Sequence, residues 1–555
     1  MDINRVIALL LASFLGLWAN VYAFFNNFIN DYVFSIDTSV LGEALPNVKS
    51  NLNRFGGRFP ENPVINEEYN PYEFIEYIQL MECSGGNSRR DLFIDPNDFS
   101  VTDDYNFEPL LSSCRGILKT GAKPLLKLGN VPAKLSRNAL AAAGEDLGAF
   151  AVNIYPPDDY NEYYAYIKAI AEALVEEFGI SEVRSWRFGV MTEYENVDWF
   201  RAVSGDPDET AEAYCKLYDF TVQALLDVLG PDVFVGAHSM TCSEGLWDEA
   251  LFIRHCAEGT NYATGKKGTR LCYLAASYYE NSPGNEGSRL TVPEIIRYFR
   301  STAESVGLTD LIFGVDEGRI LLGTKSGAVS SELNSRTVGY TYQAAFDARL
   351  IKQMFDSGMD YFSSWEYCSE SENHGLPIIT YFVAKHASDF KGAHLADVKT
   401  SWKGHIIKAD VNASAAFNES AGTLHVMAYN YRNSLDYKAS AQLKFKVKAP
   451  QLSDGEAKVT AYMIDDDCNW FDEWQKDRAD LGITDDMFSW SPDDGCPTWH
   501  NDDACRTFLS LADKYSQYCR LEPAESVVTV KNGEFTLSAD LAPNAVVFFE
   551  VTSVN

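Results

Sequence analysis

The chain has 555 residues, of which 46% are hydrophobic and 13% aromatic, and its formal net charge is −33. This length exceeds one ordinary hydrophobic core, so we expect one large domain and at least one smaller domain. The apolar content excludes an intrinsically disordered chain. The acidity excludes nucleic acid as a partner, because affinity for phosphates needs lysine and arginine.

The N-terminus is predicted to be a cleaved secretory signal peptide at 1–23. A short polar start precedes the apolar run Val6–Trp18, and Val21-Tyr22-Ala23 has small residues at the spacing that signal peptidase recognises. The alternative is an uncleaved membrane anchor, because the apolar character continues weakly to Phe25. No later run is long or apolar enough to span a bilayer. We therefore expect a secreted, extracytoplasmic protein with no stable membrane insertion after cleavage.

From about residue 50 to 390, within a domain predicted to span 24–390, short apolar runs alternate with longer amphipathic stretches. Eight strands alternating with helices is the count of a closed (β/α)8 barrel, so the fold class is predicted to be α/β with a TIM barrel. A doubly wound open sheet is the alternative, but no glycine-rich phosphate loop follows any of the runs. The runs are Ser50–Phe55, Leu92–Asp95, Pro124–Gly129, Arg187–Met191, Val233–Ala237, Leu271–Ser277, Leu311–Asp316 and Asp360–Trp365.

The connecting helices carry their own start and stop signals. Apolar residues recur at three- and four-residue spacing from Tyr163 to Phe178, and Gly179 then provides a C-terminal stop. Asp206 and Pro207 form an N-cap and a first-turn proline for the next helix. These signals place helices between the runs, as a barrel requires.

After residue 391 the apolar period changes from helical to alternating, which predicts a β-sandwich over 391–555. Leu424 and Val426 alternate with polar neighbours, and Asn532-Gly533 is typical of a hairpin turn. An acidic insertion at about 465–520 interrupts these strands.

The insertion contains four of the eleven cysteines, which could staple it with two disulfide bridges. The odd total leaves at least one thiol unpaired. The spacing of the four fits no zinc pattern and no histidine cluster accompanies them, so we expect no metal site. They are Cys468, Cys496, Cys505 and Cys519.

Two of the barrel runs end in carboxylates. Glu193 and Glu195 follow the run Arg187–Met191, and Glu317 follows the run Leu311–Asp316. Barrel enzymes place their reactive groups at the carboxyl ends of the strands. Two carboxyl groups across a barrel mouth are the working parts of glycoside hydrolysis: one protonates the leaving oxygen, and the other attacks the anomeric carbon or activates water.

Short motifs spread over most of residues 50–555 point to one family. The set resembles glycoside hydrolase family 39, the family of β-xylosidases and α-L-iduronidases among the clan A (β/α)8 glycosidases. The family's fourth-strand motif has the form Phe-Glu-Val-Trp-Asn-Glu-Pro-Asn. The matching segments are Phe188–Glu195 for that motif, Tyr105-Asn106-Phe107 with Gly121–Gly129, Lys216–Asp219 with Val235-Gly236, and Ile464-Asp465 with Asn469 and Trp474.

The resemblance implies a retaining, double-displacement mechanism that needs no cofactor and no metal. In this register Glu193 is the acid/base and Glu317, at the end of the seventh strand, is the nucleophile. Asp316 is set aside, because neighbouring strand residues point to opposite faces. Glu195 is the rival of Glu193, since it has the same parity on a continuing strand, but the motif register favours Glu193.

Further residues are predicted to bind the substrate. The resemblance implies that Tyr279 hydrogen-bonds the nucleophile and that Trp365 provides an aromatic floor for the sugar. Arg54 ends the first run, where it could orient the nucleophile or form an ion pair at the barrel mouth.

Three positions depart from the family pattern. Thr192 replaces the asparagine before the acid/base, Tyr194 replaces the proline after it, and Ser277 replaces a strand-six histidine. Thr192 therefore contacts the sugar differently from that asparagine. Trp199 is a weaker platform candidate and His238 a weaker contact, with a packed tryptophan and a structural histidine as the alternatives.

These patterns predict a secreted retaining glycosidase that cleaves terminal xylosidic, iduronidic or related bonds of an oligosaccharide, polysaccharide or other glycoside. The alternative is a catalytically silent carbohydrate-binding barrel, which the changes at Thr192 and Ser277 motivate. The sugar and its anomer, exo or endo action, glycosyl transfer and the oligomeric state are left open by the sequence.

Overall fold

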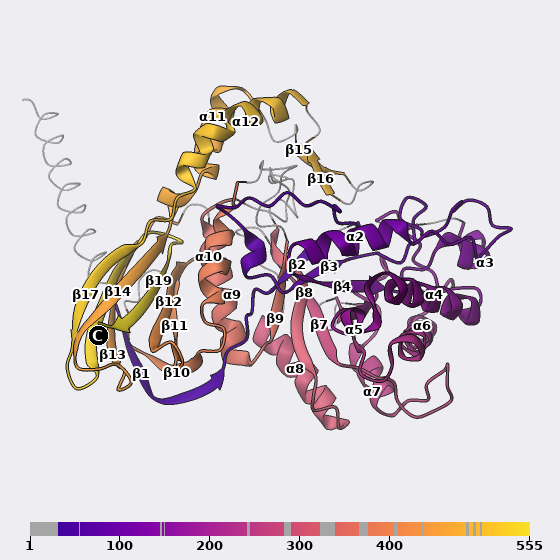
Figure 1. The fold of residues 1–555 in the computed structure, drawn as a ribbon, viewed down its shortest axis with the longest axis horizontal. Helices are drawn as coiled ribbons and strands as arrows, with labels where there is room; N and C mark the ends of the chain where they lie inside the picture. Colours follow the sequence, from indigo (N-terminus) through magenta and orange to yellow (C-terminus); the bar gives the residue numbers. More distant parts are fainter. Residues whose placement is uncertain are drawn as a thin grey trace, which may run out of the picture.

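In the computed structural model, shown in Figure 1, the described residues are 31–54, 56–144, 147–148, 150–240, 245–281, 290–321, 339–365, 376–403, 409–434, 437–483, 488–491, 496–499 and 502–554. The predicted signal peptide at 1–23 lies outside them. Within them, no helix combines the length and the apolar character that crossing a bilayer requires.

A closed barrel forms the larger half of the molecule, as predicted. Among the described residues, eight parallel strands pair in chain order, and the first closes the ring by pairing Asn51 and Leu52 with Ser363 and Ser364 of the last. The strands are β2 (Asn51–Arg54), β3 (Tyr77–Leu80), β4 (Lys123–Leu128), β5 (Arg187–Val190), β6 (Phe234–Ser239), β7 (Tyr273–Asn281), β8 (Ile312–Leu321) and β9 (Tyr361–Ser364).

The second barrel strand is not where the sequence placed it. The strand is β3 at Tyr77–Leu80, whereas the predicted run Leu92–Asp95 contains only an isolated bridge between Phe93 and Tyr105. The reason is a polar residue inside the barrel: the buried Gln79 amide donates to Asn53 Oδ1 and to the Asp316 carbonyl, both at 3.2 Å. A satisfied polar core residue breaks the apolar pattern that signals a buried strand.

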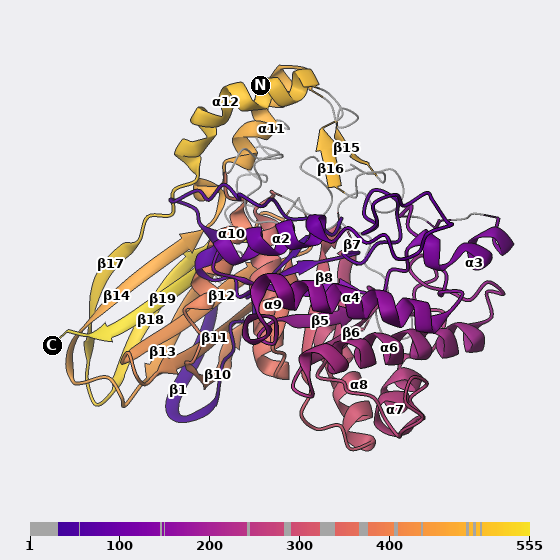
Figure 2. The same ribbon diagram turned by 45° about the vertical axis from the view of Figure 1, so that its right-hand side comes forward.

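Helices surround the barrel strands (Figures 1 and 2). The predicted helix ends are confirmed: the Asp206 side chain caps the helix that begins at Pro207, and Gly179 ends the preceding long helix. The longer helices are α2 (Glu108–Lys119), α4 (Tyr160–Phe178), α6 (Pro207–Leu229), α7 (Glu249–Glu258), α8 (Val292–Ser305), α9 (Tyr342–Ser357) and α10 (Ile379–Ser388), and the short ones are α3 (Arg137–Ala142) and α5 (Ile180–Val183).

A second sheet folds over on itself into the predicted sandwich. Phe445 of β13 and Phe549 of β19 have ring centroids 5.9 Å apart, although four strands lie between them in the order of hydrogen-bonded neighbours. The sheet therefore forms two facing layers with a core between them. Of the described strands it contains nine, in the order β17 (Ala524–Val530), β14 (Gly455–Ile464), β19 (Val546–Ser553), β12 (Thr423–Tyr431), β11 (Asp410–Asn418), β10 (His394–Lys403), β1 (Asp31–Ala44), β13 (Ala441–Lys448) and β18 (Glu534–Leu541).

The first strand belongs to this sheet and not to the barrel. The predicted barrel began at residue 24, but β1 pairs parallel with β13 and antiparallel with β10. Tyr32, Phe34 and Ile36 alternate inward, and Phe34 stacks on Phe445 with ring centroids 5.5 Å apart. The partner strands of β1 lie several hundred residues further along the chain, so nothing next to β1 in the sequence indicates which sheet it joins.

The sheet packs against the barrel through α9 and α10, which lie between the two (Figure 1). Every residue of β12 is buried, because Leu424 and Val426 face the sandwich core while Met427 and Tyr429 face the barrel helices. Arg349 of α9 crosses the junction, donating to Glu280 at 2.9 Å and contacting Asp410 of β11 at 3.4 Å.

The acidic insertion contains α11 (Phe471–Asp480), β15 (Phe488–Ser491), β16 (Cys496–Trp499) and α12 (Asp502–Tyr515), and in Figure 2 it stands at the edge of the barrel. Aromatic packing holds it together: Trp474 and Tyr515 both contact the buried Phe508. The predicted pair of bridges is wrong, because Cys468 and Cys519 are buried free thiols. The side chains of Cys496 and Cys505 lie outside the described residues.

If β1 is part of the sandwich core, Phe34→Ala should lower the free energy of unfolding by about 3–5 kcal/mol. Val40→Ala on the same strand is the matched control, because Val40 is 82% exposed and Phe34 fully buried. We expect the control to change stability by no more than about 0.5 kcal/mol. Chemical denaturation of both variants measures the difference, and equal stabilities would contradict this role of β1.

Candidate active site

Glu193 and Glu317 meet at the carboxyl ends of the barrel strands. Glu193 lies in the turn after β5, Glu317 lies on β8, and the two side chains are 8% and 4% exposed as residues. One carboxylate oxygen of each, together with one ring nitrogen of His238, lies within 4.8 Å of the others. Carboxyl groups about 5–5.5 Å apart are typical of retaining glycosidases, and separations of about 6.5–9.5 Å of inverting ones. The separation of at most 4.8 Å between a Glu193 oxygen and a Glu317 oxygen is closer to the retaining value than to the inverting one.

A bulge in β8 presents Glu317 to the barrel mouth. Val315 pairs with Ala276, but the next pair along the ladder joins Glu317 to Ser277, so Asp316 is an extra residue. An extra residue cancels the strict alternation of side chains. The sequence argument that Asp316 must face away from Glu317 was therefore wrong, because both side chains lie inside the barrel.

Buried contacts hold the bulged residue from several sides. The Asp316 carboxylate forms an ion pair with the Lys127 ammonium and accepts a hydrogen bond from the Tyr361 hydroxyl at 2.6 Å. Asn53 donates to the Asp316 carbonyl at 3.2 Å, as Gln79 does. Burial lowers the pKa of Lys127, and the Asp316 charge opposes that shift. A buried charge without a partner has a large desolvation cost. Moving either Lys127 or Asp316 away would leave the other unpaired, so each residue fixes the position of the other.

Tyr279 and Trp365 form a chain of hydrogen bonds to the nucleophile candidate. The Tyr279 hydroxyl donates to Glu317 Oε1 at 2.7 Å, and Trp365 Nε1 donates to the Tyr279 oxygen at 3.0 Å. A hydrogen bond from a neutral donor stabilises the ionised carboxylate. Trp365 thus orients the tyrosine, and the tyrosine fixes one oxygen of Glu317.

Glu193 occupies a strained turn. Its φ is 44° and that of Met191 is 65°, both in the left-handed region, which costs non-glycine residues about 1–3 kcal/mol each. Asn196 closes the turn, donating from its backbone to the Glu193 carbonyl at 2.8 Å and from Nδ2 to Glu193 Oε2 at 2.7 Å. The strand ends at Val190, so the parity assumed for Glu195 on a continuing strand does not apply.

Glu195 is directed away from the pair and into the protein. It is completely buried, and its Oε1 accepts hydrogen bonds from the Ser239 hydroxyl and the Met240 amide, both at 2.6 Å. Burial, with a contribution from the charge of Glu249, raises the pKa of Glu195 to about 8. Glu195 therefore ties the loop after β5 to the loop after β6, and Glu193 is the one that lies beside Glu317.

His238 links the two sides of the site through hydroxyl groups. Its Nδ1 is 3.2 Å from Thr192 Oγ1, and its Nε2 is 2.9 Å from Ser277 Oγ. Burial, together with the Lys127 charge, holds the pKa of His238 well below its ordinary value, so the ring is neutral. Because both ring nitrogens already have hydroxyl partners, ligation of a metal by His238 would break one of these contacts.

Arg54 and Trp199 differ in how the structure places them. Arg54 ends β2 at the barrel mouth, half-buried, with its guanidinium carbon 5.8 Å from the centre of the Phe59 ring. Trp199 is 2% exposed and stacks on Phe150, with centroids 4.5 Å apart and planes 11° apart. That is the packing of a core tryptophan, so Trp199 is not supported as a sugar platform.

Sequence reasoning missed the residues that hold the two glutamates. Lys127 and Asn196 were not singled out, and Asp316 was dismissed. Lys127 could have been found from the sequence, because it lies within an apolar run that is expected to be a barrel strand. A lysine buried in such a strand needs an acidic partner. Asn196 could not have been found in this way, because its role depends on the conformation of the turn at Glu193.

The raised pKa of Glu195 makes stability depend on pH. The folded state holds this proton more tightly than the unfolded state, whose glutamate has the ordinary value of about 4.5. The contribution is full below about pH 4.5 and is lost as the pH rises towards 8, at no more than about 1.4 kcal/mol per pH unit. Glu195→Gln should therefore flatten the decline in melting temperature between pH 5 and 8.

The matched control is Glu162→Gln, because Glu162 is exposed in the first turn of α4. The control should keep the pH dependence of the parent protein. An unchanged slope in Glu195→Gln would show that Glu195 is ionised in the folded protein throughout this range.

Comparisons with known proteins were made on sequence and on structure. A β-xylosidase of Geobacillus stearothermophilus is 29% identical over 154 residues, which are 28% of each chain. A β-xylosidase of Caldicellulosiruptor saccharolyticus is 33% identical over 112 residues, which are 20% of this chain and 21% of that one. These matches span less than a third of either relative's length.

The solved structures share the fold over nearly the whole chain. A bacterial orthologue of human α-L-iduronidase superposes with a TM-score of 0.64 at 13% identity, covering 95% of this chain and 84% of that one. A monomeric β-xylosidase from Caulobacter crescentus gives 0.62 at 15% identity, covering 94% and 100%. The sequence model of "Glycosyl hydrolases family 39" matches residues 91–420. Since that match spans more than half of the chain, the protein belongs to glycosyl hydrolase family 39.

Proposed function

We propose that the protein is a retaining glycosidase that releases a terminal sugar by double displacement. The observation that carries the proposal is the approach of a Glu193 oxygen to a Glu317 oxygen within 4.8 Å at the carboxyl ends of the barrel strands. That spacing leaves room for an anomeric carbon between the two groups but not for a water molecule in line behind it.

In the first step, a Glu317 oxygen forms a bond to the anomeric carbon while the glycosidic bond breaks. Glu193, in its acid form, gives its proton to the departing oxygen. In the second step, water attacks the same carbon and gives a proton back to Glu193. The bond to Glu317 breaks, which regenerates its carboxylate and gives net retention at the anomeric carbon.

The surrounding groups suit this division of roles. Glu317 receives the Tyr279 hydrogen bond at 2.7 Å, which favours the carboxylate that a nucleophile needs. His238 is neutral, so it does not compete as a cation for either glutamate. The Trp365 ring, held by its bond to Tyr279, is proposed to form the floor on which the sugar stacks.

The proposed substrates are terminal xylosides, iduronides or related glycosides. Support comes from the β-xylosidase relatives and from the fold shared with the iduronidase orthologue. Secretion is proposed from the signal-like pattern at 1–23. A screen of aryl xylosides, arabinosides, glucuronides, iduronides and galactosides identifies the sugar by the phenol that is released.

The second candidate is a silent carbohydrate-binding barrel, motivated by Thr192 and Ser277. In the structure both hydroxyls hold His238 beside the two glutamates, so these positions are used within the site. The same screen separates the candidates. A binding protein would shift its melting temperature with sugars but release no phenol from any aryl glycoside.

Glu317→Gln should lower kcat on the best aryl glycoside by at least about 10³-fold, because the nucleophile is lost. Glu193→Gln should lower kcat/KM, which reports the first step, by about 10²–10⁴-fold on glycosides with poor leaving groups, and by much less on a dinitrophenyl glycoside, whose leaving group needs no proton. Steady-state kinetics with a series of leaving groups measures both effects. A near-normal kcat for Glu317→Gln, or equal losses of kcat/KM for Glu193→Gln on all leaving groups, would contradict the assignment.

Tyr279→Phe should lower kcat/KM by about 10–100-fold, because a hydrogen bond to a charged group contributes about 1.5–3 kcal/mol. The neighbouring Tyr278→Phe is the matched control, since its hydroxyl faces Glu280 at 3.4 Å instead of the nucleophile. Kinetics of both variants on the same substrate measure the difference. Equal losses would mean that the tyrosines act only through folding.

A further inference from the structure

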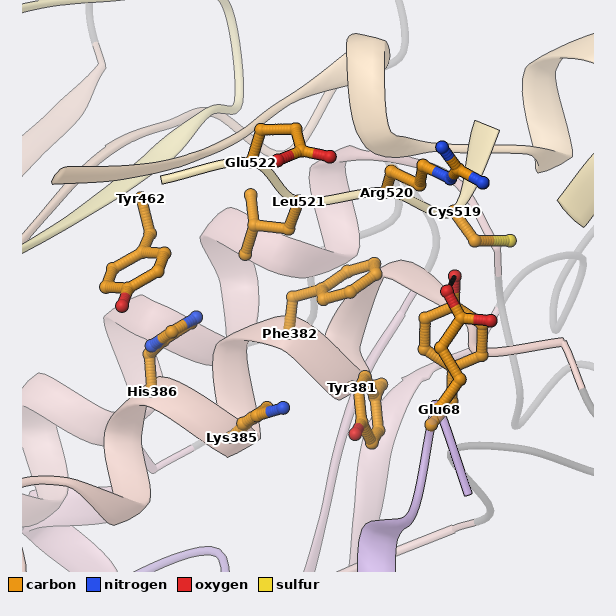
Figure 3. Close-up of a pocket in the computed structure, with 11 residues that line it drawn as sticks. Glu68, Tyr381, Phe382, Lys385, His386, Tyr462, Cys519, Arg520, Leu521 and Glu522 are labelled. Carbon is orange, nitrogen blue, oxygen red and sulfur yellow. Dashed lines mark hydrogen bonds between the residues drawn. The ribbon is translucent and has the colours of Figure 1, made fainter. Parts of the chain in front are cut away.

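A cavity of about 430 Å³ lies outside the barrel mouth, where three parts of the chain meet (Figure 3). α10 of the barrel forms its floor, Tyr462 of β14 comes from the sandwich, and residues 519–522 follow the insertion. The cavity falls within the range of about 300–1,000 Å³ that small-molecule sites occupy. Its lining shares no residue with the site at Glu193 and Glu317.

Aromatic rings from separate elements line this cavity. Tyr381 and Phe382 lie on consecutive positions of α10, Tyr69 comes from the segment before β3, and Tyr462 of β14 lies next to His386 (Figure 3). The His386 ring is parallel to that of Tyr462, with centroids 4.0 Å apart and planes 28° apart. Tyr381, Phe382 and Tyr69 are 1%, 4% and 7% exposed and therefore form the wall of the cavity, whereas Tyr462 is partly exposed. The Tyr462 ring is thus the flat surface on which the C–H face of a sugar could pack.

Charged side chains of both signs line the same cavity as the rings. Lys385, Arg520, Glu68 and Glu522 all line the cavity. Among the described residues, neither Lys385 nor Arg520 forms an ion pair, and Glu68 accepts a hydrogen bond from the Tyr69 hydroxyl at 3.0 Å. Other lysines of the described surface do pair with acids, for example Lys391 with Glu76, Lys458 with Glu525 and Lys399 with Asp397.

The balance of charges selects the chemistry of a ligand. An anion would face two carboxylates and a cation would face two basic groups, so neither is favoured as a whole. An apolar molecule would strip water from four charged groups and replace none of their hydrogen bonds. A polyhydroxylated, uncharged molecule satisfies all of them, because each hydroxyl accepts from lysine or arginine and donates to glutamate.

We propose that this cavity is an accessory binding site for an uncharged saccharide. The partly exposed Tyr462 ring would pack against a sugar face, and Lys385, Arg520, Glu68 and Glu522 would bind the hydroxyl groups. The choice of sugar rests on the proposed function, because a xylosidase meets xylose chains. The site itself does not depend on that activity. Its position on α10, β14 and the flank of the insertion lets a saccharide chain be held by the part of the molecule outside the barrel mouth.

The test is isothermal titration calorimetry of the full chain with xylotriose, in a Glu317→Gln background that prevents turnover. The pocket variant is Lys385→Met with Glu522→Gln, and the control variant is Lys444→Met with Glu456→Gln, which removes the same charges from exposed sheet positions. We expect the pocket variant to lose one binding event, with at least a tenfold weaker affinity, and the control to keep it. Thermal unfolding checks that all the proteins are folded.

An isotherm that is the same in the pocket variant and its parent, or no binding at all, would overturn the proposal. Tighter binding of glucuronic acid than of xylose at this site would also overturn it, because the site would then favour an anion. Failure of the proposed function gives a different result. The wild-type protein would release no phenol from any aryl glycoside, while the pocket variant would still lose its binding event.

Discussion

The ion pair between Lys127 and Asp316 is the constraint on which the site depends. Asp316 is the extra residue of a bulged strand, and Lys127, Tyr361 and two amide side chains hold it inside the barrel. Burying two charges has a large desolvation cost, so such a pair adds little net stability, whereas breaking it typically costs about 3–5 kcal/mol. Its consequence here is geometric, because the bulge allows Glu317 to point into the barrel mouth directly after Asp316.

On the opposite side of the site, a strained turn and its hydrogen bonds hold Glu193 in position. Glu193 lies in a turn with two residues in the left-handed region, and such strain persists only where the surroundings enforce it. Asn196 closes the turn, and the buried Glu195 fastens it to the loop after β6. His238 of β6 then joins the hydroxyls of Thr192, after β5, and Ser277 of β7. Tyr279 of β7 donates to Glu317 of β8, so that the ends of the strands from β5 to β8 form one connected network.

The period of the apolar residues was enough to predict a barrel followed by a sandwich, because most strands and helices bury a simple stripe. It failed where polar residues are buried or where a strand joins a distant sheet. β3 was missed because Gln79 is satisfied inside the barrel, and β1 was assigned to the barrel because its partners are several hundred residues away. Glu193 and Glu317 came from motif register, whereas the alternation argument against Asp316 failed at a bulge that no local pattern marks.

The central claim is that Glu317, and not its neighbour, forms the covalent bond to the sugar. The most direct measurement is peptide mapping by mass spectrometry after inactivation with a 2-deoxy-2-fluoro glycoside of the sugar that the protein cleaves fastest. The account predicts one glycosyl adduct, located on Glu317. An adduct on Asp316, Glu193 or Glu195, or full turnover with no covalent intermediate and an inverted product, would contradict it.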